Sequence, residues 1–271
     1  MQTELAQLIS LASYGNSFLH LGTTPEKYYP ESSVFQHCFK VEFRDYKKTF
    51  FFSSFKEEIC AVDPLKWFKL LKKERCLNLR LTYLPAEKND FGPEYNLAGF
   101  VGGAGSWSIE SNFGSYSHYW QKRWQISEQE LNTSWEVNYI REVRNFQPTN
   151  QQFDLEQTKS EFEKIINRLI DFCINQNITT WLETFEKSKI ALGHQHPNKL
   201  YYHNDLIVIK NYSLAAQQLL FAACNAWVFG GMGWWNDMGF EDKEVQENYL
   251  DLSQRLYDQI IKSIIVAINS Y

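Results

Sequence analysis

The chain contains an apolar run, LLFAACNAWVF at residues 219–229, which is followed at once by Gly230, Gly231 and Gly233. A helix that is apolar on all sides is normally buried, so the run predicts a helix inside a helical core. Glycines can adopt the left-handed conformation that ends a helix, and the turn WWND at residues 234–237 comes next. Two tryptophans, an asparagine and an aspartate are therefore expected where a buried helix meets the surface.

Helical periodicity surrounds this run. Asp154 and Asp242 are placed to cap helices, Ser213 is placed to cap the apolar run, and residues 179–192 predict one further helix. The inner face of the last helix is apolar at every third or fourth position: Val245, Tyr249, Leu252, Leu256, Ile260, Ile264 and Ile268. The second part of the chain therefore predicts a four-helix region.

The first part of the chain has a different pattern, rich in aromatic side chains at alternate positions. A short amphipathic helix is expected over residues 4–13, strands over residues 35–43 and 49–55, and a hairpin turn at 44–48. Asp63-Pro64 predicts the start of another helix, because proline is favoured in a first helical turn.

Strand-like segments continue over residues 76–84 and 98–143, and residues 145–152 lack periodicity and contain Pro148. Strands first and helices afterwards favour an α+β fold. We expect an N-terminal, mostly antiparallel sheet region with one or two helices over residues 1–146, followed by a C-terminal four-helix region over 147–271. The two regions are expected to pack together as one compact unit.

Charge is shared unevenly between these regions. Residues 1–150 carry 17 basic and 17 acidic side chains, whereas residues 151–271 carry 10 basic and 15 acidic ones, which accounts for the whole formal charge of −5. Phosphate contacts need clustered Lys and Arg, so an acidic half argues against nucleic acid as a partner. A basic protein is a suitable partner, because complementary fields speed association.

Cysteine usage and hydropathy predict a cytoplasmic protein. The five cysteines are widely spaced and include no Cys-x-x-Cys pair, which favours reduced thiols. The first residues lack the basic and apolar regions of a secretory signal. The longest apolar runs are shorter than the ~20 residues that span a bilayer, so no membrane partner is expected.

The tetrapeptide His203-Asn204-Asp205-Leu206 resembles the catalytic loop of phosphotransferases related to protein kinases and to choline and aminoglycoside kinases. In that family the aspartate is the catalytic base, and an asparagine five residues later holds a metal ion. Lys210 occupies that later position here, and Asn211 follows one place late. No glycine-rich loop with a strand lysine precedes the tetrapeptide, so we expect no phosphoryl transfer.

Other catalytic signals are weak. His194 and His196 alternate within a loop segment but lack further ligands at a recognised spacing, so neither a metal nor a cofactor is expected. The sequence also contains no Gly-x-Ser-x-Gly or His-Glu-x-x-His motif. If the chain is an enzyme of an unrecognised family, His203, Asp205 and Asp237 are the polar groups to test.

The favoured interpretation is a non-enzymatic cytosolic protein that masks or inhibits a protein partner, in the manner of bacterial toxin-immunity proteins. Aromatic anchors beside charged groups are typical of an interface. The expected partner-binding residues are Trp234, Trp235, Asn236, Asp237, Glu244, Glu247 and Asp251. A subunit of a larger assembly is the remaining alternative, and the sequence leaves the oligomeric state open.

Overall fold

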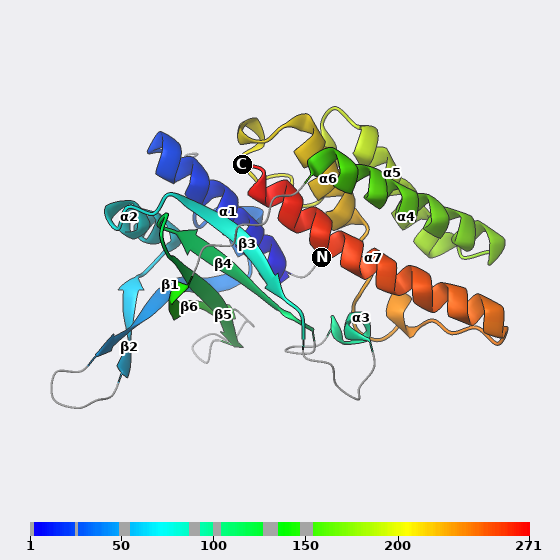
Figure 1. Ribbon diagram of the computed structural model, residues 1–271, viewed down its shortest axis with the longest axis horizontal. Coiled ribbons are helices and arrows are strands. Elements are labelled where there is room, and N and C mark those ends of the chain that lie inside the picture. The colour runs from blue at the N-terminus through cyan, green and yellow to red at the C-terminus, as the bar shows by residue number, and fades with distance from the viewer. Residues whose placement is uncertain are drawn as a thin grey trace.

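A computed structural model describes residues 3–24, 27–48, 55–86, 93–99, 104–126, 135–146 and 154–271. Figure 1 shows a six-stranded sheet built by the N-terminal part of the chain and a group of long helices built by the C-terminal part. The predicted α+β class is therefore confirmed. The predicted boundary at residues 145–152 lies, from Gln147 onward, outside the described residues.

The sheet has the strand order β2-β1-β6-β5-β4-β3. The neighbours β1 and β6 are parallel, and the other four pairs are antiparallel. The mostly antiparallel sheet expected from the sequence is thus confirmed. The strands span Cys38–Lys48 (β1), Phe55–Ala61 (β2), Asn78–Leu84 (β3), Ser106–Asn112 (β4), Ser117–Ile126 (β5) and Trp135–Phe146 (β6).

Three helices accompany the sheet: α1 (Thr3–Leu21), α2 (Pro64–Lys73) and the short α3 (Glu94–Leu97). Asp63 caps α2 by accepting a hydrogen bond of 2.7 Å from the backbone of Lys66, as the Asp-Pro pair predicts. Helix α2 packs its inner stripe against the sheet, where the Trp67 ring stacks on Phe43 at 4.2 Å between centroids.

The prediction for the first helix was wrong in length and character. Helix α1 continues to Leu21 and is buried on almost every side from Leu5 to Ser17. Its polar residues are accommodated in the core because many of them form hydrogen bonds to backbone. The side chain of Asn16, for example, accepts from the amide of Leu79 at 2.7 Å and donates to its carbonyl at 2.9 Å.

The predicted hairpin was also misplaced. Residues 44–48 continue β1, and the next described strand is β2. The strand predicted over residues 49–55 lies, up to Ser54, outside the described residues. Charged residues in this stretch suggested a turn, but Arg44 bonds to Glu57 of β2 at 3.2 Å across the strand pair. Charged residues can occupy a strand when side chains of opposite charge lie opposite them on the same face of the sheet.

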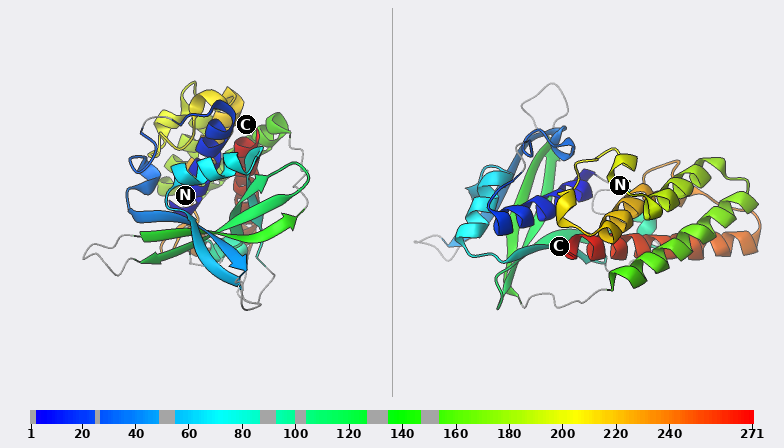
Figure 2. Two further views of the ribbon diagram at one scale, coloured as in Figure 1. Left: turned by 90° about the vertical axis from the view of Figure 1, so that its left-hand side faces the viewer. Right: turned by 90° about the horizontal axis from the view of Figure 1, so that it is seen from above.

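Four helices form a bundle: α4 (Leu155–Asn175), α5 (Thr179–Gly193), α6 (Leu214–Asn225) and α7 (Lys243–Asn269). Side chains of Asp154, Ser213 and Asp242 accept backbone hydrogen bonds at the first turns of α4, α6 and α7, which confirms all three predicted caps. The right-hand view in Figure 2 shows the bundle extending to one side of the sheet. Among the described residues, no helix is both long and apolar enough to cross a membrane.

Hydrogen bonds join the sheet region to the bundle. Asn269, in the last turn of α7, accepts from the amide of Leu81 at 2.8 Å and donates to the Leu81 carbonyl at 2.9 Å. The Tyr14 hydroxyl of α1 donates to the carbonyl of Asp205 at 2.9 Å. The described connections include four 3₁₀ turns: Ser33–Phe35 (η1) between α1 and β1, Pro197–Leu200 (η2) and Ile209–Asn211 (η3) between α5 and α6, and Trp235–Asp237 (η4) between α6 and α7.

Candidate functional site

An aromatic cluster closes the end of the bundle where α4 meets α5 and where η4 leads into α7. Trp235 lies at its centre and is 0% exposed. Its ring meets Phe185 and Tyr249 edge-on or tilted, each at 5.3 Å between centroids. The sequence left open which tryptophan of the pair points inward. The structure places the ring of Trp235 in the core, where it supports the surface and cannot itself contact a partner.

Trp234 has the opposite environment and is 43% exposed. Its indole lies flat against Gly230, where a Cβ atom would overlap the ring. On another side it approaches Trp181 of α5 at 6.2 Å between centroids. Glycine at this position is therefore needed for the close approach, which gives the first glycine of the segment a packing role.

The two polar residues of η4 hold the turn together. The Asn236 side chain accepts from the amide of Gly230 at 3.0 Å and donates to its carbonyl at 3.1 Å. Asp237 accepts from the amide of Gly233 at 2.6 Å, and Gly233 has a φ of +82°, which favours glycine. Asn236 therefore fixes the position of Trp234, while the exposed Asp237 both braces the turn and adds a charge beside the ring.

Three predicted acidic residues lie on the first turns of α7, and all are exposed. Asp251 is paired with Arg255 at 2.8 Å and with Arg168 at 3.5 Å. Glu244 and Glu247, by contrast, have no ion pair with any described residue. These two carboxylates are available to an external cation. We use the term bundle-end surface for Met232, Trp234, Asp237, Glu244 and Glu247.

A second polar cluster contains two of the residues named for the enzymatic alternative. The hydroxyl of Ser33 donates to the carboxylate of Asp205, and the Ser33 amide donates to the same carboxylate at 2.9 Å. The ring Nδ1 of His203 lies 2.6 Å from that hydroxyl oxygen. Burial raises the pKa of Asp205, but the hydrogen bonds from the hydroxyl and amide of Ser33 outweigh it and lower the pKa below 3.8.

In this cluster the serine lies between the histidine and the aspartate. Hydrolytic triads place the imidazole between the other two groups, so that it can take the proton of the nucleophile. Here the only hydroxyl proton of Ser33 goes to Asp205, and the imidazole of His203 can then only donate to the serine oxygen. The arrangement ties η1 to the loop before α6. Sequence patterns could not reveal Ser33, which is 172 residues from Asp205.

The structure does not bring Asp237 to this cluster. Asp237 accepts from the amide of Gly233 instead, and it shares no hydrogen bond or ion pair with Ser33, His203 or Asp205. The two histidines of the other candidate segment stay in an exposed loop, where His194 Nδ1 accepts from the amide of His196 at 2.9 Å. Within the described part of the chain, no three His, Cys, Asp or Glu residues form a group that could hold a metal ion.

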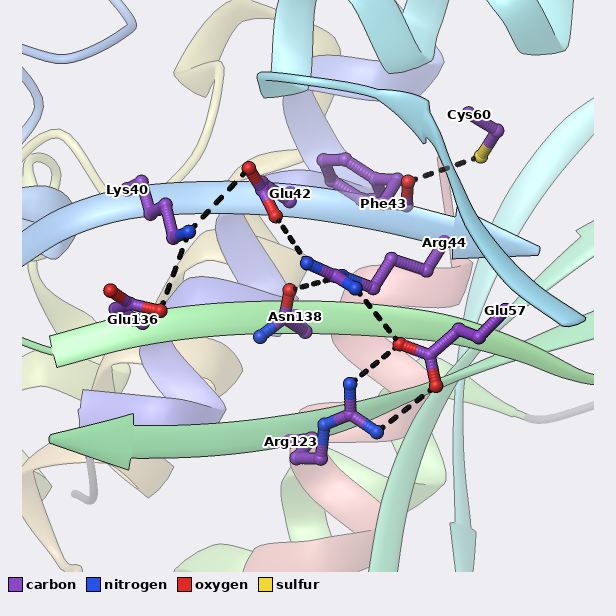
Figure 3. Close-up of polar contacts among 9 residues, drawn as sticks. All are labelled: Lys40, Glu42, Phe43, Arg44, Glu57, Cys60, Arg123, Glu136 and Asn138. Atoms are coloured by element: carbon purple, nitrogen blue, oxygen red, sulfur yellow. Dashed lines mark hydrogen bonds and ion pairs between the residues drawn. The ribbon is translucent and has the colours of Figure 1, made fainter. Parts of the chain in front are cut away.

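The sheet carries a third polar cluster, drawn in Figure 3, which the sequence analysis missed. Glu57 accepts from Arg123 at 2.6 and 3.1 Å and from Arg44 at 3.2 Å. Arg44 also pairs with Glu42 at 2.8 Å. The alternation Lys40, Glu42, Arg44 was the available signal. Because these side chains pair with one another, we interpret the cluster as part of the scaffold.

Comparisons with protein-family models, with curated proteins and with solved structures found no match for this chain. Any functional proposal therefore depends on the geometry and chemistry of its own residues.

Proposed function

We propose that this chain is a non-catalytic cytosolic protein that masks a basic protein partner through the bundle-end surface. The observation that carries the proposal is the exposed ring of Trp234, which Gly230 and Asn236 hold in place at the turn that leads into α7. The first turns of α7 then carry Glu244 and Glu247, which are exposed and have no ion pair among the described residues. A rigid aromatic ring loses little conformational freedom on binding, which is why tryptophan is common among the residues that dominate binding energy.

An apolar neighbour extends this surface. Met232 is 91% exposed, and its flexible side chain can adapt to the shape of a partner. Together the methionine and the tryptophan provide an apolar centre, and the carboxylates of Asp237, Glu244 and Glu247 provide a polar rim. This arrangement resembles the composition of protein interfaces.

The charge of this region indicates the chemistry of the partner. Residues 237–251 contain six carboxylates and one lysine, a balance of −5 that equals the formal charge of the whole chain. Concentrated negative charge accelerates association with a positively charged protein and repels acidic competitors. A basic partner surface is therefore the best match.

Masking rather than catalysis also fits the second polar cluster, in which Ser33 engages both His203 and Asp205. Bacterial toxin-immunity proteins act in this manner, by covering a partner, and provide an analogy in kind. The analogy rests on acidity and surface chemistry.

Affinity capture from the native host, followed by binding kinetics, tests the proposal. We expect Trp234→Ala to weaken partner binding by about 30-fold or more, while its melting temperature stays near that of the parent. The matched control is Tyr202→Ala, which removes a ring that is 63% exposed and lies before α6, at the opposite end of that helix. Equal affinities of both variants and the parent protein would contradict the proposal.

Charge reversal provides the second arm of this test. The double variant Glu244→Lys/Glu247→Lys should slow association and reduce its dependence on salt. Reversing two exposed acids in the first half of α4, Glu156→Lys/Glu163→Lys, serves as the control for net charge, because this half of α4 lies beside the last turns of α7. If both pairs change the association rate equally, the effect comes from net charge alone and the proposed location is wrong.

A further inference from the structure

The short helix α3 lies where the sheet region meets the bundle. Figure 1 shows it beside α7 and near the ends of β3 and β4. Its first residue, Glu94, accepts hydrogen bonds from the hydroxyl of Tyr83 and from the amides of Ala86, at 3.2 Å, and Gly105. Tyr83 belongs to β3, Ala86 follows that strand, and Gly105 precedes β4. One carboxylate therefore fastens α3 to the ends of two strands.

The C-terminal end of α3 contacts the segment that follows α6. Gly99, two residues after α3, has no room for a side chain, because a Cβ atom there would overlap the carbonyl group of Gly230. Two backbones can approach each other this closely only where a glycine lacks the Cβ atom. Tyr95 of α3 is 1% exposed, and its ring lies 5.8 Å from that of Phe229 between centroids. Helix α3 and the residues after it therefore lie directly against Phe229 and Gly230.

Gly230 also supports the exposed ring of the bundle-end surface. A Cβ atom at Gly230 would overlap the indole of Trp234, and Asn236 bonds to the amide and the carbonyl of Gly230 at 3.0 and 3.1 Å. Trp234 and Gly99 thus contact the same glycine. A displacement of Gly230 would displace the ring that rests on it.

We propose that α3 positions Trp234 through the contact between Gly99 and Gly230, and that Glu94 is the positioning residue that holds α3 in place. The inference rests on the proposed function, because it concerns the same surface. Trp235 holds this turn from the side of α7, whereas α3 supports it from the side of the sheet. A ring that is held in one orientation before binding loses less freedom when the partner is bound. The sheet region thereby contributes to partner binding, although the bundle-end surface contains none of its residues.

Fluorine nuclear magnetic resonance of the full chain, labelled with 5-fluorotryptophan, tests this inference without the partner. The chain has nine tryptophans, and the signal of Trp234 is the one that is missing from Trp234→Phe. We expect Gly99→Ala to shift or broaden this signal, because the added methyl group must displace Gly230 and with it the ring. An unchanged Trp234 signal in the folded variant would overturn the inference.

Two other glycine substitutions separate positioning from lost stability. Gly15→Ala crowds the buried core between α1, α2 and β3, so it should lower the melting temperature but leave the Trp234 signal in place. At Gly193, beyond its own helix, no described atom lies within 4 Å of an added Cβ atom, so Gly193→Ala should change neither. If Gly15→Ala moves the signal as much as Gly99→Ala does, the effect reports general destabilisation and the inference is wrong.

A second variant removes the anchor of α3 instead of crowding its contact. Glu94→Ala should also shift the Trp234 signal, and it should weaken partner binding less than Trp234→Ala does, because the ring remains. The fold should persist, since Asn269 joins α7 to Leu81 independently. Glu57→Ala, which removes a paired carboxylate of β2, is the matched control and should leave the signal unchanged. Equal effects of these two carboxylate variants would overturn the inference.

The outcomes also separate this inference from the proposed function. If Gly99→Ala does not fold, the result with Glu94→Ala decides. An unmoved Trp234 signal, with Trp234→Ala still disrupting the partner complex, rejects only the role of α3. Failure of the Trp234→Ala test rejects the proposed function itself.

Discussion

The indole nitrogen of Trp235 donates a hydrogen bond of 2.8 Å to the hydroxyl of Ser253. The carbonyl of Trp235 accepts a second bond, of 2.5 Å, from the hydroxyl of Tyr249. Both partners lie on α7, so the segment after the glycines is fastened to this helix through side chain and backbone together. The preceding residue, Trp234, can face outward because Trp235 makes the bonds that hold this segment to α7.

This division of roles predicts unequal stability effects for the two tryptophans. Trp235→Ala should lower the free energy of unfolding by about 3–5 kcal/mol, because it empties a fully buried site. Trp234→Ala should lower it by about 1 kcal/mol, since nearly half of its surface is already exposed. Urea unfolding measures both. Similar losses for the two variants would show that the exposed ring is structural as well.

The hydrogen bond between Ser33 and Asp205 joins η1 to the loop before α6, and we expect it to contribute to the free energy of unfolding. Ser33→Ala should lower the free energy of unfolding by about 1–3 kcal/mol, because it leaves a half-buried carboxylate with fewer donors. Asn204→Ala, at the exposed neighbouring residue, is the control. A double-mutant cycle with Asp205→Asn should show coupling, and additive losses would contradict a direct tie.

The same bond sets a direction for pH dependence. The pKa of Asp205 is lowered in the folded protein, so its ionised form stabilises the fold above pH 3.8, and this contribution is lost as the pH falls through the folded pKa. Ser33→Ala removes a hydrogen bond that lowers this pKa. The variant should therefore lose less stability than the parent protein as the pH falls. Unfolding curves from pH 5 to pH 2.5 measure the effect.

His118 of β5 predicts a second pH effect in a higher range. Burial and the charge of Arg141 lower the pKa of His118 from 6.5 to about 4. The neutral ring therefore stabilises the fold, and this contribution is lost as the pH falls from 6.5 toward 4. Between pH 7.5 and 5 the loss should reach about 2 kcal/mol.

Replacing the ring isolates this contribution. His118→Gln should flatten the stability profile over this range, whereas His196→Gln, at an exposed position, should leave it unchanged. An unaltered profile in the His118 variant would mean that the imidazole is solvated and titrates normally.

The cluster in Figure 3 predicts a salt-sensitive contribution to stability. Glu57→Gln leaves the guanidinium groups of Arg44 and Arg123 without their shared carboxylate. We expect a loss of about 1 kcal/mol at low ionic strength, and a smaller loss at high salt, because the groups are partly exposed and screened. Glu183→Gln on α5 is the control. A loss independent of salt would point to packing instead of charge.

Local signals account for much of what the sequence predicts correctly. Asp63, Asp154, Ser213 and Asp242 cap helices because capping depends on residues only two or three positions away. The inner face of α7 is buried as its periodicity predicts, apart from the half-buried Val245 near the helix start. These features need no knowledge of distant contacts.

Features that depend on distant residues could not be predicted in this way. The burial of α1 on almost all sides depends on partners such as Leu79 and Val208, which satisfy Asn16 and Ser13. The charged residues at 44–48 were interpreted as a turn, because the sequence did not show that Arg44 pairs with Glu57 of β2. The contact between Gly99 and Gly230 involves residues more than 130 positions apart, so helical periodicity does not reveal it.

If Trp234 lies at the partner surface, site-specific photocrosslinking in the native host should detect the contact. The photoreactive residue p-benzoylphenylalanine replaces Trp234 in one variant and Tyr202 in the other, since both side chains are aromatic and exposed. We expect a specific crosslink from position 234 to one basic protein, which is absent from position 202 and reduced by Glu244→Lys/Glu247→Lys. No crosslink from position 234, or an equal yield of the same product from both positions, would contradict it.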